Sequence, residues 1–419
     1  MGFASEYLSA RILFAPFISS RPDRKTAIIV IIPAYNEPEI LRTVDSLARC
    51  EKPACEVEVL IHVNAAGSAG RKELEANTIT VNDIRSKAED MSLPFRLFAF
   101  NTGKPSIKAW GAGLARKVAM DEAVRRFNFI NNPEGLIVSL DADCLVAENY
   151  LVSLYRDFYK KHERRACSIY FEHPTSGNEF GKDVYRAISA YELHLRYYYQ
   201  GLKYSMFPGV YHTVGSAFAV RAETYVRSGG MNRQQAGEDF YFIQKTIPMG
   251  GYFYLNNTGV YPSPRLSDRV PFGTGPAIKD ILQNNATGFA SYNPVSFQHL
   301  RELFLKVGSL YSSENDKESQ DLLIDINTDL LAFLENENWL GRLREIKSNT
   351  ASRDSFEKRF YSWFNMFKIV KYLNWVHKEG SLNKIDVTDA ADTLLKLMGL
   401  DFKSDSVSEL LSYYRSLES

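Results

Sequence analysis

The chain has 419 residues, of which 45% are hydrophobic and 24% are charged, a composition typical of soluble globular proteins. This length suits one large α/β domain with an accessory domain. The formal net charge is zero, so the chain lacks a broad basic field for nucleic acid or an anionic membrane. The longest unbroken apolar run, Ala27 to Ile32, is too short to span a bilayer.

The first 24 residues lack the basic start of a signal peptide, and Glu6 and Arg11 interrupt their apolar stretch. Their amphipathic pattern suits contact with a membrane surface, but packing against the main domain is the favoured interpretation. Cys50, Cys55, Cys144 and Cys167 form no CxxC pair, so we expect buried, reduced thiols. We predict a cytoplasmic protein, with peripheral contact at the inner face of the membrane as an open alternative.

From Lys25 the sequence alternates between strand and helix patterns. Such repeated units predict an α/β fold, with a mainly parallel, doubly wound sheet flanked by helices. Ligands of these sheets bind beyond the carboxyl ends of the strands. The predicted strands are 27–32, 57–63, 95–100 and 135–140, and the predicted helices are 38–48, 71–90, one from about 106, and 182–205.

After residue 276 the sequence shows helical stripes without chemistry-bearing motifs. We predict an N-terminal segment over 1–24, the α/β domain over 25–275 and a mainly helical C-terminal accessory region over 276–419. Residues 312–319 are polar enough to predict a loop. Tyr197 and Tyr199 fall off the apolar stripe of their helix. Sugar rings could stack on them, or they could face a lipid-linked acceptor, but packing against the C-terminal helices is the favoured interpretation.

Polar residues follow the first two strands. Pro33 ends the first strand pattern, and the loop continues through Ala34, Tyr35, Asn36 and Glu37. Asn64 follows the second strand and has the donor and acceptor needed to read a nucleobase edge. Each loop alone would also suit an ordinary strand-to-helix turn.

A glycine and several cations follow the third strand, at Asn101-Thr-Gly103-Lys104, Lys108 and Arg116. Cations near a helix N-terminus suit an anion. The segment is not a Walker loop, because no Gly-Lys-Ser/Thr closes it. Solvated surface lysines are the equal alternative.

The triplet Asp141-Ala142-Asp143 directly follows the buried run Leu136–Leu140. Two carboxylates one residue apart can present oxygens to one hard cation. Burying two like charges together is costly without a cation or hydrogen bonds. The position of the triplet therefore favours binding of a metal or a donor diphosphate over a structural turn.

Two later segments add acids and arginines. Glu238 and Asp239 follow Gly237 at a predicted helix start, where a catalytic role and helix capping are equally suitable. Arg265 and Arg269 lie in a proline-rich segment and could clamp a diphosphate bidentately.

In this order the motifs resemble those of the family 2 glycosyltransferases of the GT-A fold, over about residues 25–275. The segments that carry the resemblance are the first strand with Pro33–Glu37, the step Ala115-Arg116, the triplet Asp141–Asp143, Gly215–Arg221, Gly229-Gly230 and Gly237–Asp239.

The resemblance implies a metal-dependent, inverting glycosyltransferase of the hexosyltransferase type, acting in glycan or polysaccharide biosynthesis. The donor would be a UDP- or GDP-sugar, and the acceptor a saccharide or a lipid-linked saccharide; no nucleic acid is expected. Asp143 would ligate Mg2+ or Mn2+, Asp141 would contact the ribose or the metal, and Asp239 would be the base. The residues expected to bind the nucleotide sugar are Pro33, Ala34, Tyr35, Asn36, Glu37, Asn64, Lys108, Arg116, Asp141, Ala142, Asp143, Glu238, Arg265 and Arg269.

The chain departs from the family pattern in two places. The second strand exit reads Asn64-Ala-Ala-Gly-Ser instead of an acid-rich segment, and no histidine lies between His212 and His299 to ligate the metal. Asp268 could substitute, Arg265 or Arg269 could neutralise the diphosphate, or the metal could use fewer protein ligands. A sugar nucleotidyltransferase and an inactive nucleotide-sugar-binding protein are the rival predictions.

Overall fold

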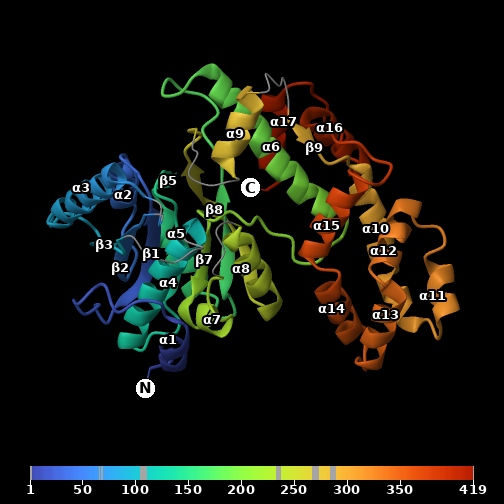
Figure 1. Ribbon diagram of the computed structural model, residues 1–419, viewed down its shortest axis with the longest axis horizontal. Coiled ribbons are helices and arrows are strands. Elements are labelled where there is room, and N and C mark those ends of the chain that lie inside the picture. Colours follow the sequence, from blue (N-terminus) through green and yellow to red (C-terminus); the bar gives the residue numbers. More distant parts are fainter. Residues whose placement is uncertain are drawn as a thin grey trace. The chain divides into compact units, whose positions relative to one another are not determined.

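The computed structural model describes residues 2–65, 67, 69–103, 111–232, 237–266, 273–283 and 289–418. The chain packs into two compact units (Figure 1). The first contains Met1–Tyr185, Tyr211–Asp280 and Glu418–Ser419, and the second contains Arg186–Val210 and Ile281–Leu417. The predicted domain limits after residues 24 and 275 remain predictions.

The first unit is built on an eight-stranded sheet with the order β3-β2-β1-β4-β7-β6-β8-β5. Strands β1 to β4 run parallel, whereas β7 runs antiparallel to both of its neighbours. The predicted α/β class with a mainly parallel sheet is therefore confirmed. The strands are β1 (Thr26–Ala34), β2 (Glu56–Val63), β3 (Arg96–Asn101), β4 (Leu136–Ser139), β5 (Cys144–Val146), β6 (Ala166–Phe171), β7 (Phe218–Arg221) and β8 (Tyr252–Pro262).

Strand β1 lies in the middle of the parallel strands, and its residues from Thr26 to Ile32 are all buried. This burial on both faces explains its unbroken run of β-branched residues. Ala34 pairs with Val63 of β2, and Val63 pairs with Asn101 of β3. The segments that follow these strands therefore leave the sheet at one edge, as does the segment after β4.

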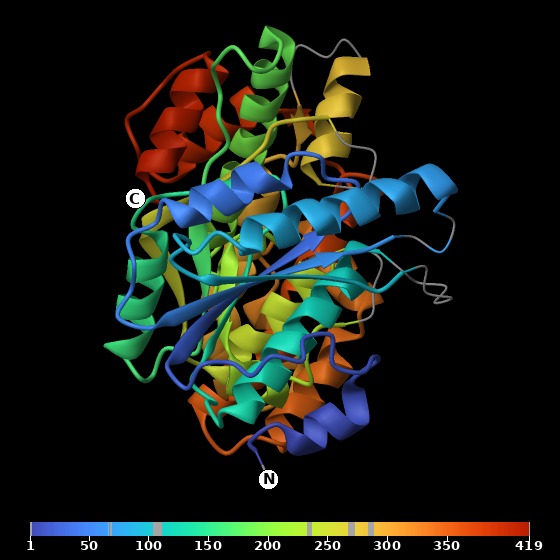
Figure 2. The same ribbon diagram turned by 90° about the vertical axis from the view of Figure 1, so that its left-hand side faces the viewer.

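Helices cover both faces of the parallel strands. Figure 2 shows α2 and α3 on one face and α4 with α1 on the other. Helix α4 is buried along most of its length, which explains why its sequence shows little amphipathic pattern. The helices of this unit include α1 (Ser5–Arg11), α2 (Ile40–Ala48), α3 (Arg71–Ala88), α4 (Ala112–Phe129), α5 (Tyr150–Tyr159), α7 (Ala222–Arg227), α8 (Glu238–Thr246) and the 3-10 turn η1 (Ile247–Met249).

The N-terminal segment packs against the buried side of α4. The Tyr7 hydroxyl donates to Asp121 Oδ1 at 2.7 Å and accepts from Lys117 Nζ at 3.1 Å. Further along, the backbone amide of Ile18 donates to Glu122 at 3.3 Å. The charged residues of α4 thus find partners in the segment that covers them, and several apolar side chains of this segment join the core.

We expect Tyr7→Phe to lower the free energy of unfolding by about 1–3 kcal/mol, because it removes one partner of a buried carboxylate and a buried ammonium. The midpoint of urea unfolding measures this loss. Tyr155→Phe is the matched control, since the Tyr155 hydroxyl has no hydrogen bond within the described part of the chain. Equal midpoints for the two variants would contradict the expectation.

The second unit is helical, as predicted for the C-terminal region. Its core combines aliphatic and aromatic side chains, with Phe360 and Phe364 stacked and Phe333 packed edge-on against Tyr372. The elements are α6 (Lys182–Tyr204), which begins in the first unit, α10 (Val295–Ser312), α11 (Asp316–Leu322), α12 (Thr328–Asn336), α13 (Trp339–Ser348), α14 (Arg353–Trp363), α15 (Met366–Val376), α16 (Val387–Leu397), α17 (Val407–Ser416) and the paired strands β9 (Ala290–Ser291) and β10 (Ile385–Asp386); α9 (Thr274–Gln283) spans the division between the units.

Of the two sequence predictions about this region, the favoured packing of Tyr197 and Tyr199 is confirmed, whereas the predicted loop is too long. Both tyrosines are buried, because α6 is enclosed on more than its apolar stripe; the Tyr197 hydroxyl donates to the Tyr292 carbonyl at 2.7 Å. Helix α11 begins inside the predicted loop 312–319, where the Asn315 side chain caps it. Among the described residues, every helix is too short or too polar to cross a membrane.

Candidate active site

Arg116 organises the inner part of the site at the carboxyl edge of β4. Helix α4 holds this arginine in a buried position, where its guanidinium makes four hydrogen bonds. Nη2 donates to Asp141 Oδ1 at 2.9 Å and Nε to Glu238 Oε1 at 3.1 Å. Nη1 donates to Ser139 Oγ at 2.6 Å and to the Gly215 carbonyl at 2.9 Å. This engagement suits a residue that positions the two acids rather than one that contacts a diphosphate.

Asp239 lies beside this arginine at the start of α8. Gly237 precedes the helix with φ 73°, a conformation that favours glycine. A Cβ atom on Gly215 would lie 2.8 Å from Arg116 Nη2 and 2.9 Å from Asp239 Oδ2. A side chain at this position would push both groups away, so the glycine leaves room for the Asp239 carboxyl close to the group that holds Asp141.

The electrostatic environment of Asp239 favours its protonated form. Burial raises the pKa of Asp239 to about 7, and the neighbouring charges of Glu238 and Asp141 act in the same direction. Arg116 and a hydrogen bond from the Phe240 amide, 2.7 Å long, oppose this rise. A carboxyl group with this pKa can take up and release a proton near neutral pH.

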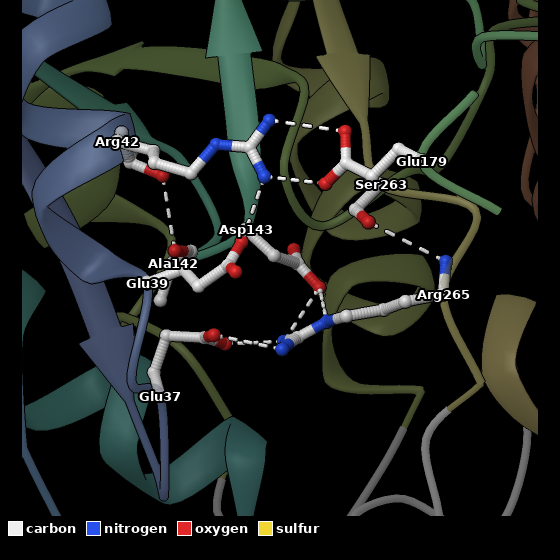
Figure 3. A network of polar contacts seen from close by, with 9 residues as sticks. Glu37, Glu39, Arg42, Ala142, Asp143, Glu179, Ser263 and Arg265 are labelled. Atoms are coloured by element: carbon white, nitrogen blue, oxygen red, sulfur yellow. Dashed lines mark hydrogen bonds and ion pairs between the residues drawn. The ribbon is translucent and has the colours of Figure 1, made fainter. Parts of the chain in front are cut away.

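Arg265 organises the outer part of the site (Figure 3). Its Nε and Nη2 lie 2.9 and 2.8 Å from Oδ2 of Asp143, and its Nη1 donates to Oε1 of Glu37 at 2.7 Å. Nη2 also pairs with the second oxygen of Glu37. Burial raises the pKa of Asp143, Arg265 opposes this rise, and Asp141 and Glu37 add to it. The loop after β8 is thereby tied to the exits of β1 and β4.

A second arginine lies in the network of Figure 3 without touching the Asp-X-Asp carboxylates. Arg42 of α2 pairs with Glu39 at 2.7 Å and with Glu179. Next to it, the Thr43 hydroxyl donates to the Ala142 carbonyl at 3.0 Å and so fixes the backbone of the triplet.

The first strand is longer than predicted, because Pro33 and Ala34 still belong to β1. Tyr35 turns toward α3, where its hydroxyl donates to Glu73 Oε1 at 2.6 Å. Asn36 is exposed and has φ 48°, a value typical of a turn.

Asn64 is buried at the exit of β2. Its side-chain amide donates to the Ala34 carbonyl at 2.8 Å, and its backbone carbonyl accepts from the Asn77 side chain at 2.8 Å. These contacts join the ends of β1 and β2, so the amide that was expected to read a nucleobase also has a structural role.

Lys108 and Arg269, which were predicted to bind the donor, lie outside the described residues, as does the alternative ligand Asp268. Sequence reasoning missed Ser139 and Thr43, and it named Gly215 only as part of a motif, without a role in the site. Ser139 donates to the Gly215 carbonyl at 2.7 Å while it accepts from Arg116. Its only signal in the sequence was a polar residue inside an otherwise apolar strand.

The acids of the site suit a hard cation in their chemistry. Asp141 and Asp143 supply carboxylate oxygens, and each arginine uses only one oxygen of its aspartate. No group of three or more His, Cys, Asp or Glu side chains within the described ranges is arranged to hold a metal ion. A cation here would complete its coordination with water or with oxygens of a bound molecule. When ionised, the five carboxyl groups of Glu37, Asp141, Asp143, Glu238 and Asp239 exceed in charge the two guanidinium groups of Arg116 and Arg265.

No family model matches the sequence, and no curated protein matches it. Solved structures show a weak similarity. TarS residues 1–349 from S. aureus, in complex with UDP-GlcNAc, is 13% identical with a TM-score of 0.40, over 80% of this chain and 91% of that chain. The Pyrobaculum calidifontis mannosyltransferase PcManGT, in complex with GDP-Man and Mn2+, is 16% identical with a TM-score of 0.37, over 87% and 93%.

Glucosyl-3-phosphoglycerate synthase from Mycobacterium tuberculosis, in complex with Mn2+, UDP-Glc and glycerol 3-phosphate, is 13% identical with a TM-score of 0.36, over 68% of this chain and 87% of that chain. At this level of similarity, none of the three structures assigns an activity to this chain.

Proposed function

We propose that this chain transfers a sugar from a UDP- or GDP-linked donor to an acceptor hydroxyl, with inversion at the anomeric carbon. The proposal rests on one observation: Asp141 and Asp239 both lie close to the Arg116 guanidinium, and Asp143 is two residues after Asp141. It agrees with the resemblance to family 2 glycosyltransferases, which predicted the same three acids.

Asp143 and Asp141 would hold Mg2+ or Mn2+, with oxygens of the donor diphosphate as further ligands. A bound cation would stabilise the negative charge that develops on the leaving nucleoside diphosphate. Thr43 supports this role, because it fixes the backbone between the two aspartates. Arg265 adds a guanidinium group that matches a diphosphate in shape.

Asp239 would act as the general base. Its carboxylate accepts the proton of the acceptor hydroxyl while that oxygen bonds to the anomeric carbon, and the bond from this carbon to the diphosphate breaks. Attack from the face opposite the leaving group inverts the anomeric configuration. A pKa of about 7 supports this role, because a base is most effective when its pKa lies near the working pH. Arg116 and Ser139 would keep the base and Asp141 in place.

The test is a panel of UDP- and GDP-sugars with Mn2+, read out by thermal shift and by release of nucleoside diphosphate. A ligand at 100 times its Kd stabilises the native state by about 2.7 kcal/mol, so the true donor class should raise Tm. Slow hydrolysis of the same donor should follow, and Asp143→Ala should abolish both signals.

Each other outcome would decide against the proposal. A rise in Tm without release of nucleoside diphosphate would indicate a binding protein. Release of pyrophosphate from a nucleoside triphosphate and a sugar phosphate would indicate a nucleotidyltransferase. No response to any nucleotide sugar would remove the proposal altogether.

A further inference from the structure

Arg265 holds the Asp143 carboxylate through two nitrogen atoms. Both Nε and Nη2 lie within 2.9 Å of the same oxygen, Oδ2. The rest of the guanidinium faces Glu37, where Nη1 and Nη2 pair with the two carboxylate oxygens (Figure 3). One arginine therefore bridges an acid from the exit of β1 and an acid from the exit of β4.

The charged groups of this bridge are largely buried, which strengthens their electrostatic interactions. The side chain of Glu37 is 1% exposed, that of Arg265 21% and that of Asp143 29%. Charges in such positions are poorly screened by solvent, so neither acid is readily left without a positive partner. Arg265 supplies that partner to both acids at once.

We propose that Arg265 is a resident counter-cation of Asp143, which competes with a divalent metal for this carboxylate and moves to the donor diphosphate when the metal binds. The competition follows from geometry and charge: a metal ion on Oδ2 would face the two nitrogens that already lie there, and a metal ion on Oδ1 would lie beside the same positive group. The move to the diphosphate rests on the proposed function. Glu37 is then a positioning residue, since it keeps the guanidinium at the site while its partner changes.

The chain offers a matched control for the effect of charge. Arg42 belongs to the same network and pairs with two acids, Glu39 and Glu179, but it has no bond to Asp143. Removing either arginine deletes one positive charge near the site. Only removal of Arg265 also releases the Asp143 carboxylate.

The experiment is a calorimetric titration of the full chain with Mn2+ alone, without nucleotide, and Tm confirms the folding of each variant. We expect Arg265→Gln to bind Mn2+ about tenfold more tightly than the wild-type chain, and Arg42→Gln to stay within about twofold. Asp143→Asn should lose the binding. Arg265→Lys is the second variant. Lysine keeps the charge but cannot bridge both acids, so we expect its affinity for Mn2+ to be about threefold higher than that of the wild-type chain.

The inference is overturned if Arg265→Gln binds Mn2+ no more tightly than the wild-type chain, if Arg42→Gln gains as much, or if no variant binds Mn2+. Failure of the proposed function looks different, because Mn2+ would then bind as expected while no nucleotide sugar is turned over.

Discussion

Asp239→Asn is expected to release nucleoside diphosphate from the donor about 10²–10⁴-fold more slowly than the wild-type chain, the usual contribution of a general base. Asparagine keeps the shape of the side chain but cannot accept the proton. The KM for the donor should change little, because Asp239 is proposed to act on the acceptor. Steady-state kinetics with the donor that the nucleotide-sugar panel selects measure both constants.

The same substitution should alter the pH dependence. Turnover by the wild-type chain should rise with pH through about 7, where Asp239 loses its proton, and the variant should lack this step. The pKa of Asp239 is higher in the folded chain than in the unfolded chain, so protonated Asp239 stabilises the fold. This contribution to the free energy of unfolding is lost as the pH rises toward and past 7. Asp239→Asn should therefore melt higher than the wild-type chain at pH 8, by roughly 2–4 °C for each kcal/mol.

Asp157→Asn is the matched control. Although burial raises the pKa of Asp157, hydrogen bonds from Asn257 and Arg164 lower it below its usual range. This variant should melt lower than the wild-type chain at pH 8 and keep its turnover. A variant of Asp239 that retains turnover, or that melts lower than the wild-type chain at pH 8, would reject the role of Asp239 as base.

Arg116→Met should be the most destabilising change in the site. It leaves Asp141 and the buried Glu238 without their shared cation, and removal of one partner from a buried ion pair costs about 3–5 kcal/mol. Arg42→Met, at a half-exposed ion pair, should cost less than about 1 kcal/mol. The midpoints of urea unfolding compare the two variants.

A double variant shows whether Arg116→Met destabilises the chain through unbalanced charge or through lost packing. Arg116→Met combined with Glu238→Gln should unfold at a higher urea concentration than Arg116→Met alone, because it removes one of the unbalanced charges. Equal midpoints for Arg116→Met and Arg42→Met would show that Arg116 does not balance the buried acids.

The strands that lead to the site could be predicted from the sequence. A strand buried on both faces, such as the one that contains Ala27–Ile32, leaves a continuous apolar run. The Asp141-Ala142-Asp143 triplet was found because two acids directly follow such a run. The sequence alone could not tell whether Asp239 is a catalytic base or a helix-capping residue, since acidic residues are common in both roles. Its proximity to Arg116 through Gly215 favours the catalytic role.

The partners of the polar side chains could not be predicted. Arg116 and Lys108 looked alike as cations on one helix, but burial turns Arg116 toward four protein oxygens. Asn64 was read as a nucleobase contact because its side chain suits that role, yet its amide joins two strand ends. Such contacts depend on which residues lie opposite each other after folding, and local sequence does not carry that information.

The reversed direction of β7 has a consequence for how the site can diversify. Phe218 at the start of β7 lies opposite Ser139 at the end of β4, so the segment around Gly215 enters the sheet where its neighbours leave it. One side of the site is therefore formed by the arriving segment, which leads into β7. The other side is formed by the departing segments, which follow β1 and β4. Changes in the arriving segment before Gly215 would alter the surroundings of Asp239, whereas the contacts of Arg265 with Glu37 and Asp143 belong to the departing segments. On the proposed function, the acceptor site would therefore vary more readily than the contacts around Asp143.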